Sequence, residues 1–147
     1  MIPLVLSVDD DKVTQMLNQM IFTRCGFSKT SVTCMNGKEA LQFFEKKLAE
    51  GNLAYDLPAI IFLDLNMPVM DGWEFLNAFT THYTAAFPAT KVVILSSTIN
   101  PLEKEKALEN KNVIEFLCKP LTLEMLSSLK NSPAIKHYFL SNDSMIV

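Results

Sequence analysis

Basic clusters and long apolar runs are both missing from this sequence. The chain has 147 residues and a formal net charge of -3, and its longest basic run is the pair Lys46-Lys47. Nucleic-acid binding depends on Lys and Arg that neutralise phosphates, so we expect no direct contact with DNA or RNA. The N-terminal segment "MIPLVLSVDDDK" has an apolar run too short to cross a bilayer and no basic residues before it. We therefore expect no membrane span, no signal peptide and a cytoplasmic location.

Cysteine and histidine are too few and too scattered for a disulfide framework or a zinc site. Cys25, Cys34 and Cys118 show no C-x-x-C spacing, and His82 and His137 stand alone in the sequence. We expect the thiols to be buried or half-buried small side chains. The composition, with 49% hydrophobic and 20% charged residues, is that of an ordinary globular chain, and the length fits one domain.

Apolar segments of strand length alternate with stretches of helical length. The predicted strands are residues 4–8, 32–35, 60–63, 92–95 and 113–118. Between them, apolar residues recur three and four positions apart, which is typical of helices with one buried face. The residues expected on these buried faces are Val13, Met16, Leu17, Met20, Ile21, Ala40, Leu41, Phe44, Leu48, Leu76, Phe79, Tyr83, Met125, Leu126 and Leu129. A weaker helix is predicted near residues 102–110.

Helix starts are marked by capping patterns. In "NGKE", "DGWE" and "NPLE", an Asn or Asp stands three residues before a Glu, so the two side chains can satisfy free N–H groups of the first turn. Pro101 takes the first helical position of the last pattern, where its missing N–H does no harm. Asp11 is expected to begin the first helix. The alternation of strands and helices predicts an α/β fold, a (βα)5 unit with a parallel sheet between helical layers.

The polar residues that interrupt the apolar runs gather at the carboxyl ends of the predicted strands. Asp9 and Asp10 end the first strand, Asp64 the third, Ser96 the fourth and Lys119 the fifth. These ends form one edge of an open parallel sheet, beyond which ligands bind. We therefore expect the side chains to converge on one site.

Phosphoryl chemistry fits this set of side chains. Two carboxylates about 4 Å apart repel each other by roughly 4 kcal/mol at an effective dielectric of about 20, so the aspartates need a cation. An all-oxygen set suits Mg²⁺, and Lys119 adds a fixed positive charge. A carboxylate beside both can attack a phosphoryl group and form an aspartyl phosphate. Asp64 is the predicted nucleophile, and Ser96 is placed to donate a hydrogen bond to the product.

At these positions the sequence resembles the receiver domain of two-component response regulators, the family of the chemotaxis response regulator. The motifs "VDDD", "LDLNMPVMDGWEF", "ILSS" and "FLCKP" follow the family's order, and the resemblance covers about residues 3–129. It implies a flavodoxin-like three-layer sandwich with strand order 2-1-3-4-5. It also implies that Asp64 is phosphorylated and that Mg²⁺ is held by Asp10, Asp64 and the backbone carbonyl of Asn66, with Asp9 assisting through water. Finally, it implies a cis bond before Pro120.

The same resemblance implies a signalling role in a phosphorelay rather than an ordinary enzyme. The phosphoryl group would come from a sensor histidine kinase or a histidine phosphotransfer protein, and the chain would catalyse only its own phosphorylation and dephosphorylation. Inward movement of Ser96 would be coupled to rotation of Phe116, although an ordinary core role for Phe116 is an open alternative. The output would pass to an unknown downstream protein, through a monomer or a phosphorylation-linked dimer. Asn66 and Thr98 border the site and are expected to tune the phosphoryl lifetime.

The sequence departs from the family pattern in a few places. Ser97 stands where the family usually has Ala or Gly, and Phe116 lacks the hydroxyl of the tyrosine often found there. The tail "SPAIKHYFLSNDSMIV" extends beyond the usual end. It could continue the last helix, form a packing arm or dock elsewhere, and helix continuation is the favoured alternative. We predict a receiver unit over residues 1–131 and a C-terminal extension over 132–147, without a separate output domain.

Three other functions fit the sequence less well. A haloacid-dehalogenase-like phosphatase would need a second carboxylate at position 66, which is Asn66 here. A flavodoxin would bind a flavin phosphate at its first loop, but "SVDDDK" would repel it. A receiver-like scaffold that is never phosphorylated has no support, because every residue that the chemistry requires is present.

Overall fold

A parallel sheet of five strands in the order β2-β1-β3-β4-β5 forms the centre of the protein. The computed structural model describes residues 1–51 and 57–144, with side chains to residue 140. The strands are β1 (Ile2–Val8), β2 (Ser28–Cys34), β3 (Ile60–Leu63), β4 (Lys91–Ser96) and β5 (Val113–Cys118). The predicted fold class and strand order are therefore confirmed. The second strand begins four residues before its predicted start, because its polar residues "SKTS" carry no apolar signal.

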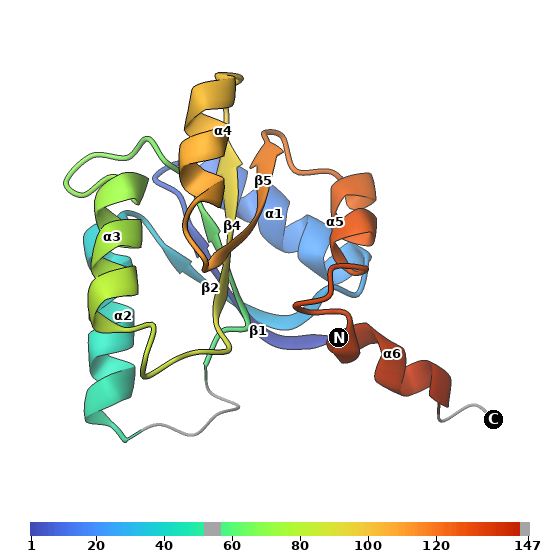
Figure 1. Cartoon of the computed structure of the whole chain (residues 1–147). Helices are drawn as coiled ribbons and strands as arrows, with labels where there is room; N and C mark the ends of the chain where they lie inside the picture. The colour runs from blue at the N-terminus through green and yellow to red at the C-terminus, as the bar shows by residue number, and fades with distance from the viewer. Residues whose placement is uncertain (52–56, 145–147) are drawn as a thin grey trace.

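Helices cover both faces of the sheet. They are α1 (Lys12–Arg24), α2 (Gly37–Ala49), α3 (Gly72–His82), α4 (Pro101–Leu108), α5 (Leu123–Leu129) and α6 (His137–Ser144). Figure 1 shows α1 and α5 on one face and α2, α3 and α4 on the other, which makes three layers. Within the described ranges, no helix is both long and apolar enough to cross a bilayer.

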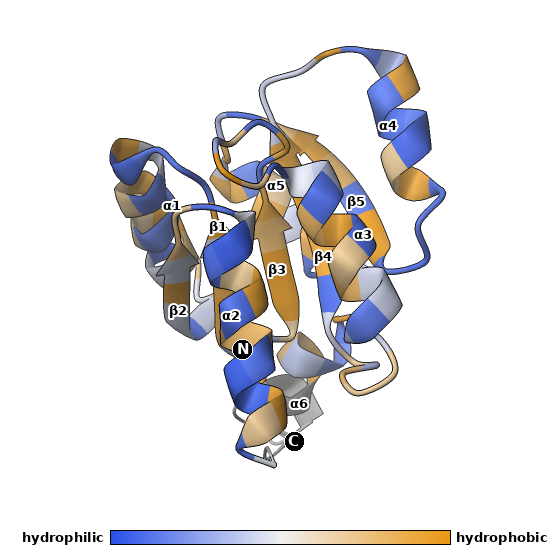
Figure 2. Cartoon of the chain, turned by 90° about the vertical axis from the view of Figure 1, so that its left-hand side faces the viewer, coloured by the Kyte–Doolittle hydropathy of each residue, from blue (hydrophilic) through white to orange (hydrophobic). Residues whose placement is uncertain are grey.

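The strand β3 is buried on both faces and divides the core in two. Ile61 and Leu63 face the cluster beneath α2 and α3, whereas Ile60 and Phe62 face the cluster beneath α1 and α5. This agrees with its continuous apolar run, visible in orange in Figure 2. Because both faces are filled, the chain that leaves β3 is held firmly at the carboxyl edge of the sheet.

The prediction for α1 was wrong about which face is buried. Val13, Met16, Leu17 and Met20 are exposed, at 63%, 63%, 52% and 58% respectively. The residues that face the sheet are Gln15, Asn18 and Phe22. The spacing correctly predicted an amphipathic helix. Its polar side nevertheless faces the sheet, because that side carries a hydrogen-bond donor for the strand ends. Leu48 of α2 is exposed as well, at 49%, because it lies at the end of its helix, beyond the sheet.

The amide of Gln15 explains this orientation. Its Nε2 donates to the carbonyl oxygens of Ser7 (2.9 Å), Asp9 (3.1 Å) and Cys34 (3.1 Å), at the ends of β1 and β2. The Cys34 carbonyl also accepts from the backbone N–H of Asp9 (3.0 Å), and a buried carbonyl without a donor is costly. A polar side chain therefore takes the place that an apolar residue was expected to fill.

The helix caps follow the sequence closely. The side chain of Asp71 accepts a hydrogen bond from the backbone N–H of Glu74 (2.8 Å), and the Glu74 carboxylate accepts one from Asp71 (3.2 Å). Asp11 caps α1 as expected, since it accepts from the N–H groups of Val13 and Thr14. In "NGKE", the Glu39 carboxylate instead accepts from the N–H of Met35. These caps fix the starts of α1 and α3, which follow the loops at the carboxyl ends of β1 and β3.

The C-terminal segment does not continue the last helix as expected. The helix α5 ends at Leu129, the chain turns through Ser132, and α6 then lies beyond the end of the sheet where β1 begins (Figure 1). Ile135 is buried, and the ring of Phe139 lies 5.5 Å from that of Phe27. The backbone carbonyl of Tyr138 accepts from the amino group of Met1 at 2.6 Å. The segment is thus a packing arm at the end of the molecule opposite the carboxyl edge of the sheet.

The helix α4 is held by few side chains. Ala107 is its buried residue. The ammonium of Lys106 lies 4.2 Å from the centre of the Trp73 ring on α3, which is a cation–π contact. This contact joins α4 to the helix that follows the Asp64 loop.

Candidate functional site

Asp64 lies at the carboxyl end of β3, where the core holds its backbone in place. Its N–H donates to the carbonyl oxygen of Val8 (3.0 Å), and the residue is 5% exposed. Gly72 packs so closely that a Cβ there would overlap the Asp64 carbonyl oxygen, so the start of α3 requires glycine. The loop between them closes with a hydrogen bond from the N–H of Gly72 to Leu65 (3.0 Å).

Three carboxylates meet at this edge. One oxygen from each of Asp9, Asp10 and Asp64 lies within 4.8 Å of the others. Asp9 is buried and accepts from the N–H of Asp11 (2.9 Å), whereas Asp10 is exposed. An acidic, all-oxygen set that is open to solvent on one side matches the preferences of Mg²⁺. The donor set therefore fits the metal that the sequence led us to expect.

Lys119 bridges two of these carboxylates. Its Nζ lies 2.7 Å from Oδ2 of Asp9 and 3.2 Å from Oδ2 of Asp64. Its backbone N–H donates to the carbonyl of Ser96 (2.9 Å), which fixes the end of β5 beside β4. The Lys119–Pro120 peptide bond is cis. The ammonium thus lies between the carboxylates of Asp9 and Asp64 and contacts both.

Burial and neighbouring charges change how this pair titrates. Burial raises the pKa of Asp64, and although the charge of Lys119 opposes this and that of Asp9 adds to it, the net direction is upward. Burial alone would lower the pKa of Lys119, but the hydrogen bond to Asp9 and the two carboxylate charges outweigh it, so its pKa lies above the usual value. Lys119 is therefore a permanent cation, and the burial of Asp64 favours binding of a further cation.

The fourth strand supplies hydroxyl groups to the edge. Ser96 is fully buried, and its Oγ accepts from the backbone N–H of Thr98 (3.2 Å). Ser97 is exposed and Thr98 is half-buried. Phe116 is buried on the α2–α3–α4 side of the sheet, in the same cluster as Ala107 of α4. It is thus a core aromatic that shares its cluster with α4.

The structure brings most of the predicted side chains into contact. Asp9, Asp64 and Lys119 interact directly, and Asp10 completes the acidic group. The backbone N–H of Asn66 points to the Asp64 carboxylate (3.3 Å). Sequence reasoning missed Gln15, which holds the carbonyl of Asp9. A glutamine on the polar side of an amphipathic helix looks like a solvent-facing residue, so the sequence carried no signal for it.

Comparison with known proteins decides the family. Residues 5–130 match the response regulator receiver domain. The chain belongs to this family. The receiver chain is 31% identical to the probable methanogenesis regulatory protein FilR2 of Methanothrix harundinacea, over 93% of the chain and 83% of that protein. It is 28% identical to protein PilG of Pseudomonas aeruginosa, over 83% of the chain and 80% of PilG.

Solved structures agree with this assignment. A two component response regulator from Cytophaga hutchinsonii superposes with a TM-score of 0.79 at 31% identity, over 88% of this receiver and 95% of that chain. The complex of CheX and CheY with BeF₃ and Mg²⁺ from Borrelia burgdorferi gives a TM-score of 0.70 at 26% identity, over 87% of both chains. The receiver also matches the sensory/regulatory protein RpfC of Xanthomonas campestris at 29% identity, but spans 16% of its length.

Proposed function

We propose that this receiver takes a phosphoryl group onto Asp64 and thereby switches its contacts with other proteins. The observation that carries the proposal is the position of Asp64, buried at the sheet edge 3.2 Å from the Lys119 ammonium and within the acidic cluster. A single buried carboxylate would be a liability. Next to a cation site and a fixed ammonium it becomes a nucleophile.

The reaction is a transfer between the donor and a carboxylate oxygen of Asp64. That oxygen attacks phosphorus, the bond from phosphorus to the donor nitrogen breaks, and its electron pair leaves with the donor imidazole, which takes up a proton. Lys119 stabilises the charge on the transferring oxygens. Ser96 is placed to bond a phosphoryl oxygen once its hydroxyl turns from Thr98. The buried surroundings hold the Lys119 ammonium and the Ser96 hydroxyl in place before the transfer.

Mg²⁺ would be held by Asp10, Asp64 and the backbone carbonyl of Asn66, with Asp9 assisting through water. When bound, it supplies positive charge that offsets the carboxylate repulsion and the charge on the phosphoryl oxygens. With that charge supplied, the Lys119 ammonium would be free to leave Asp9 and bond the phosphoryl oxygens.

The partners follow from this chemistry. We propose a sensor histidine kinase or a histidine phosphotransfer protein as the donor, a cytoplasmic location and an unknown protein as the receiver of the signal. A phosphoryl group adds between about one and two negative charges, which shifts an existing equilibrium through Ser96, Phe116 and α4. The unit would comprise residues 1–131 with the extension 132–147, acting as a monomer or a phosphorylation-linked dimer.

Residues at the mouth of the site are proposed to set the phosphoryl lifetime. Asn66 is exposed beside Asp64, and Thr98 lies against Ser96. Both can orient or exclude the water that hydrolyses the aspartyl phosphate. Dephosphorylation rates of Asn66→Ala and Thr98→Ala that match the wild-type rate would contradict this role.

Intact mass tests the phosphorylation. Wild type and Asp64→Asn are incubated with Mg²⁺ and acetyl phosphate. We expect one phosphoryl adduct that hydroxylamine removes, and none on the variant. An adduct that persists on Asp64→Asn, or its absence from the wild type, would overturn the proposal and leave a receiver-like binding module. Continuous hydrolysis of phosphomonoesters would indicate a phosphatase instead.

A further inference from the structure

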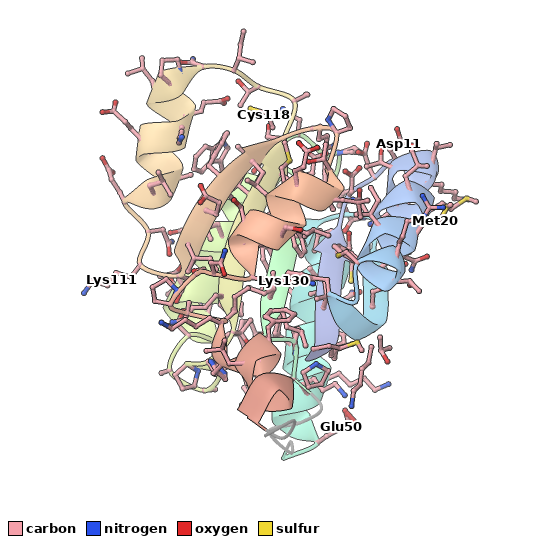
Figure 3. All side chains as sticks on the ribbon, turned by 90° about the vertical axis from the view of Figure 1, so that its right-hand side faces the viewer. Asp11, Met20, Glu50, Lys111, Cys118 and Lys130 are labelled. Carbon is pink, nitrogen blue, oxygen red and sulfur yellow. The ribbon has the colours of Figure 1, made fainter. Side chains whose placement is uncertain are left out.

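The loop between β1 and α1 carries three consecutive aspartates whose side chains are held in different ways. Asp9 is buried, and its carboxylate contacts the Lys119 ammonium (2.7 Å) and the N–H of Asp11 (2.9 Å). Asp11 caps α1, and Figure 3 labels it at the start of that helix. Asp10 is exposed, and among the described residues no hydrogen bond or ion pair holds its carboxylate. The direction of the Asp10 side chain therefore depends on its backbone.

Hydrogen bonds hold both peptide planes that flank Asp10. The peptide between Asp9 and Asp10 contains the Asp9 carbonyl, which accepts from Nε2 of Gln15 (3.1 Å). The peptide between Asp10 and Asp11 contains the Asp11 N–H, which donates to the Asp9 carboxylate (2.9 Å). Because each peptide is rigid and planar, holding both planes confines the φ and ψ angles of Asp10. Those two angles set the direction in which its side chain leaves the backbone.

Gln15 is placed to hold the first of these planes. The residue is 4% exposed, and its Nε2 also donates to the carbonyls of Ser7 (2.9 Å) and Cys34 (3.1 Å), so three acceptors share two N–H bonds. The amide cannot be reversed, because its oxygen would then face three carbonyl oxygens and be repelled by them. The Gln15 side chain thus ties the acidic loop to the ends of β1 and β2.

The burial of this glutamine carries a cost that an apolar side chain would avoid. Its Oε1 is buried without a hydrogen-bond partner among the described residues, and an unsatisfied buried acceptor lowers stability. Proteins carry such local costs mainly at functional sites. The position of the amide beside the acidic cluster therefore indicates a role beyond packing.

We propose that Gln15 is a positioning residue for the Mg²⁺ site, because by holding the Asp9 carbonyl it aims the Asp10 carboxylate at the space beside Asp64. The inference rests on the proposed function and adds to it a residue that touches neither the metal nor the phosphoryl group. Asp9 and Asp64 are buried and contact Lys119, so packing and charge already fix them. Asp10 is the ligand that can turn away. Loss of the Gln15 amide should widen the range of directions of Asp10 and weaken the binding of Mg²⁺.

Affinity for Mg²⁺ alone measures this role without any phosphoryl transfer. Gln15→Met keeps the length of the side chain and removes the donor, and Gln15→Leu is a second variant that lacks it. Ile135→Val is the control, because Ile135 is buried in the packing arm and the loss of a methylene there lowers stability without touching the acidic loop. Dissociation constants come from ¹H–¹⁵N spectra titrated with Mg²⁺ at constant ionic strength, in which the signals of the folded protein are followed.

We expect both Gln15 variants to bind Mg²⁺ about tenfold more weakly than the wild type, as for other residues that orient metal ligands. Ile135→Val should bind as the wild type does. Asp10→Asn should weaken binding too, and Gln15→Met should weaken it little further in the double variant, because the glutamine acts through Asp10. Gln15 variants that bind Mg²⁺ as tightly as the wild type would overturn the proposal.

Two other outcomes would also contradict the positioning role. If the effects of Gln15→Met and Asp10→Asn multiply in the double variant, the glutamine acts on the site by a route other than Asp10. If Ile135→Val weakens binding as much as Gln15→Met does, affinity follows stability alone. A wild type without Mg²⁺-dependent shifts would instead refute the metal assignment of the proposed function, and this inference with it.

Discussion

The ammonium of Lys119 lies closer to Asp9, at 2.7 Å, than to Asp64, at 3.2 Å. The lysine is therefore shared between two buried carboxylates, and its shortest contact is not with the predicted nucleophile. One ammonium faces three carboxylates, so the cluster keeps an excess of negative charge. A divalent cation would relieve that excess and free Lys119 for the phosphoryl group.

We expect Mg²⁺ to raise the melting temperature. Binding to the folded state alone stabilises it, and about 1 kcal/mol moves the midpoint of a chain of this size by roughly 3–5 °C. Asp10→Asn should reduce the increase, because Asp10 is an exposed member of the cluster that can change without disturbing the core. Glu45→Gln, the same change at an exposed position on α2, should keep it. Thermal unfolding in Na⁺ of matched ionic strength is the reference, and equal midpoints would refute the metal assignment.

Gln15→Leu should lower the free energy of unfolding by about 1–2 kcal/mol. It removes the donor shared by three buried carbonyls, and the loss is partly offset because the Gln15 Oε1 has no hydrogen-bond partner among the described residues. Gln19→Leu, one turn along the same helix and half-buried, is the matched control and should change stability little. Urea denaturation measures both. A Gln15 variant as stable as the control would mean that the amide does not hold the strand ends.

Val69 should be a site of backbone strain. It is a β-branched residue with φ of 72° and lies 77% exposed in the loop between β3 and α3. The left-handed region disfavours such residues, at a cost of about 1–3 kcal/mol. We expect Val69→Asn and Val69→Gly to raise the urea midpoint. The gain from Gly should be smaller, because glycine increases the conformational entropy of the unfolded chain. A fall in stability for both would show that the valine side chain makes a contact worth more than the strain.

The thiols should differ sharply in reactivity. Burial raises the pKa of Cys34 to about 12, and the charge of Glu39 adds to the rise, whereas Cys118 is exposed at the end of β5 (Figure 3). Iodoacetamide at mild pH should therefore label Cys118 first and Cys34 only on unfolding, as peptide mass mapping will record.

The Cys34 thiol should also make the stability of the fold depend on pH. Since the pKa of Cys34 is higher in the folded state, the contribution of this thiol to the free energy of unfolding is full below the ordinary value of 9.0 and is lost as pH rises towards 12. Cys34→Ala should flatten the stability profile in that window, and a profile unchanged by the substitution would contradict this.

The sheet and the cluster of polar residues at its carboxyl edge could be predicted because each signal is local. An apolar run that ends in Asp64, or in Ser96, gives both the strand and the position of the polar group at its end. Parallel pairing then brings these ends together, whatever the lengths of the helices. The capping side chains, such as Asp71, bond to backbone groups within four residues, so they could be predicted from the sequence as well.

The side of α1 that faces the sheet could not be predicted, because spacing alone does not say what covers an apolar stripe. Gln15 is buried to serve backbone carbonyls of two strands, a requirement that no local pattern records. The end of α5 is a different case. Pro133 cannot continue a helix without losing a hydrogen bond, so its position in the tail was a signal against the expected continuation.

The contact between Lys106 and Trp73 gives this protein a built-in optical reporter. Trp73 is the chain's one tryptophan, so its fluorescence under selective excitation comes from the junction of α3 and α4. A cation held over an indole alters its emission, and withdrawal of the lysine changes the signal. Movement of α4 can therefore be followed in the unlabelled protein, in real time and at low concentration.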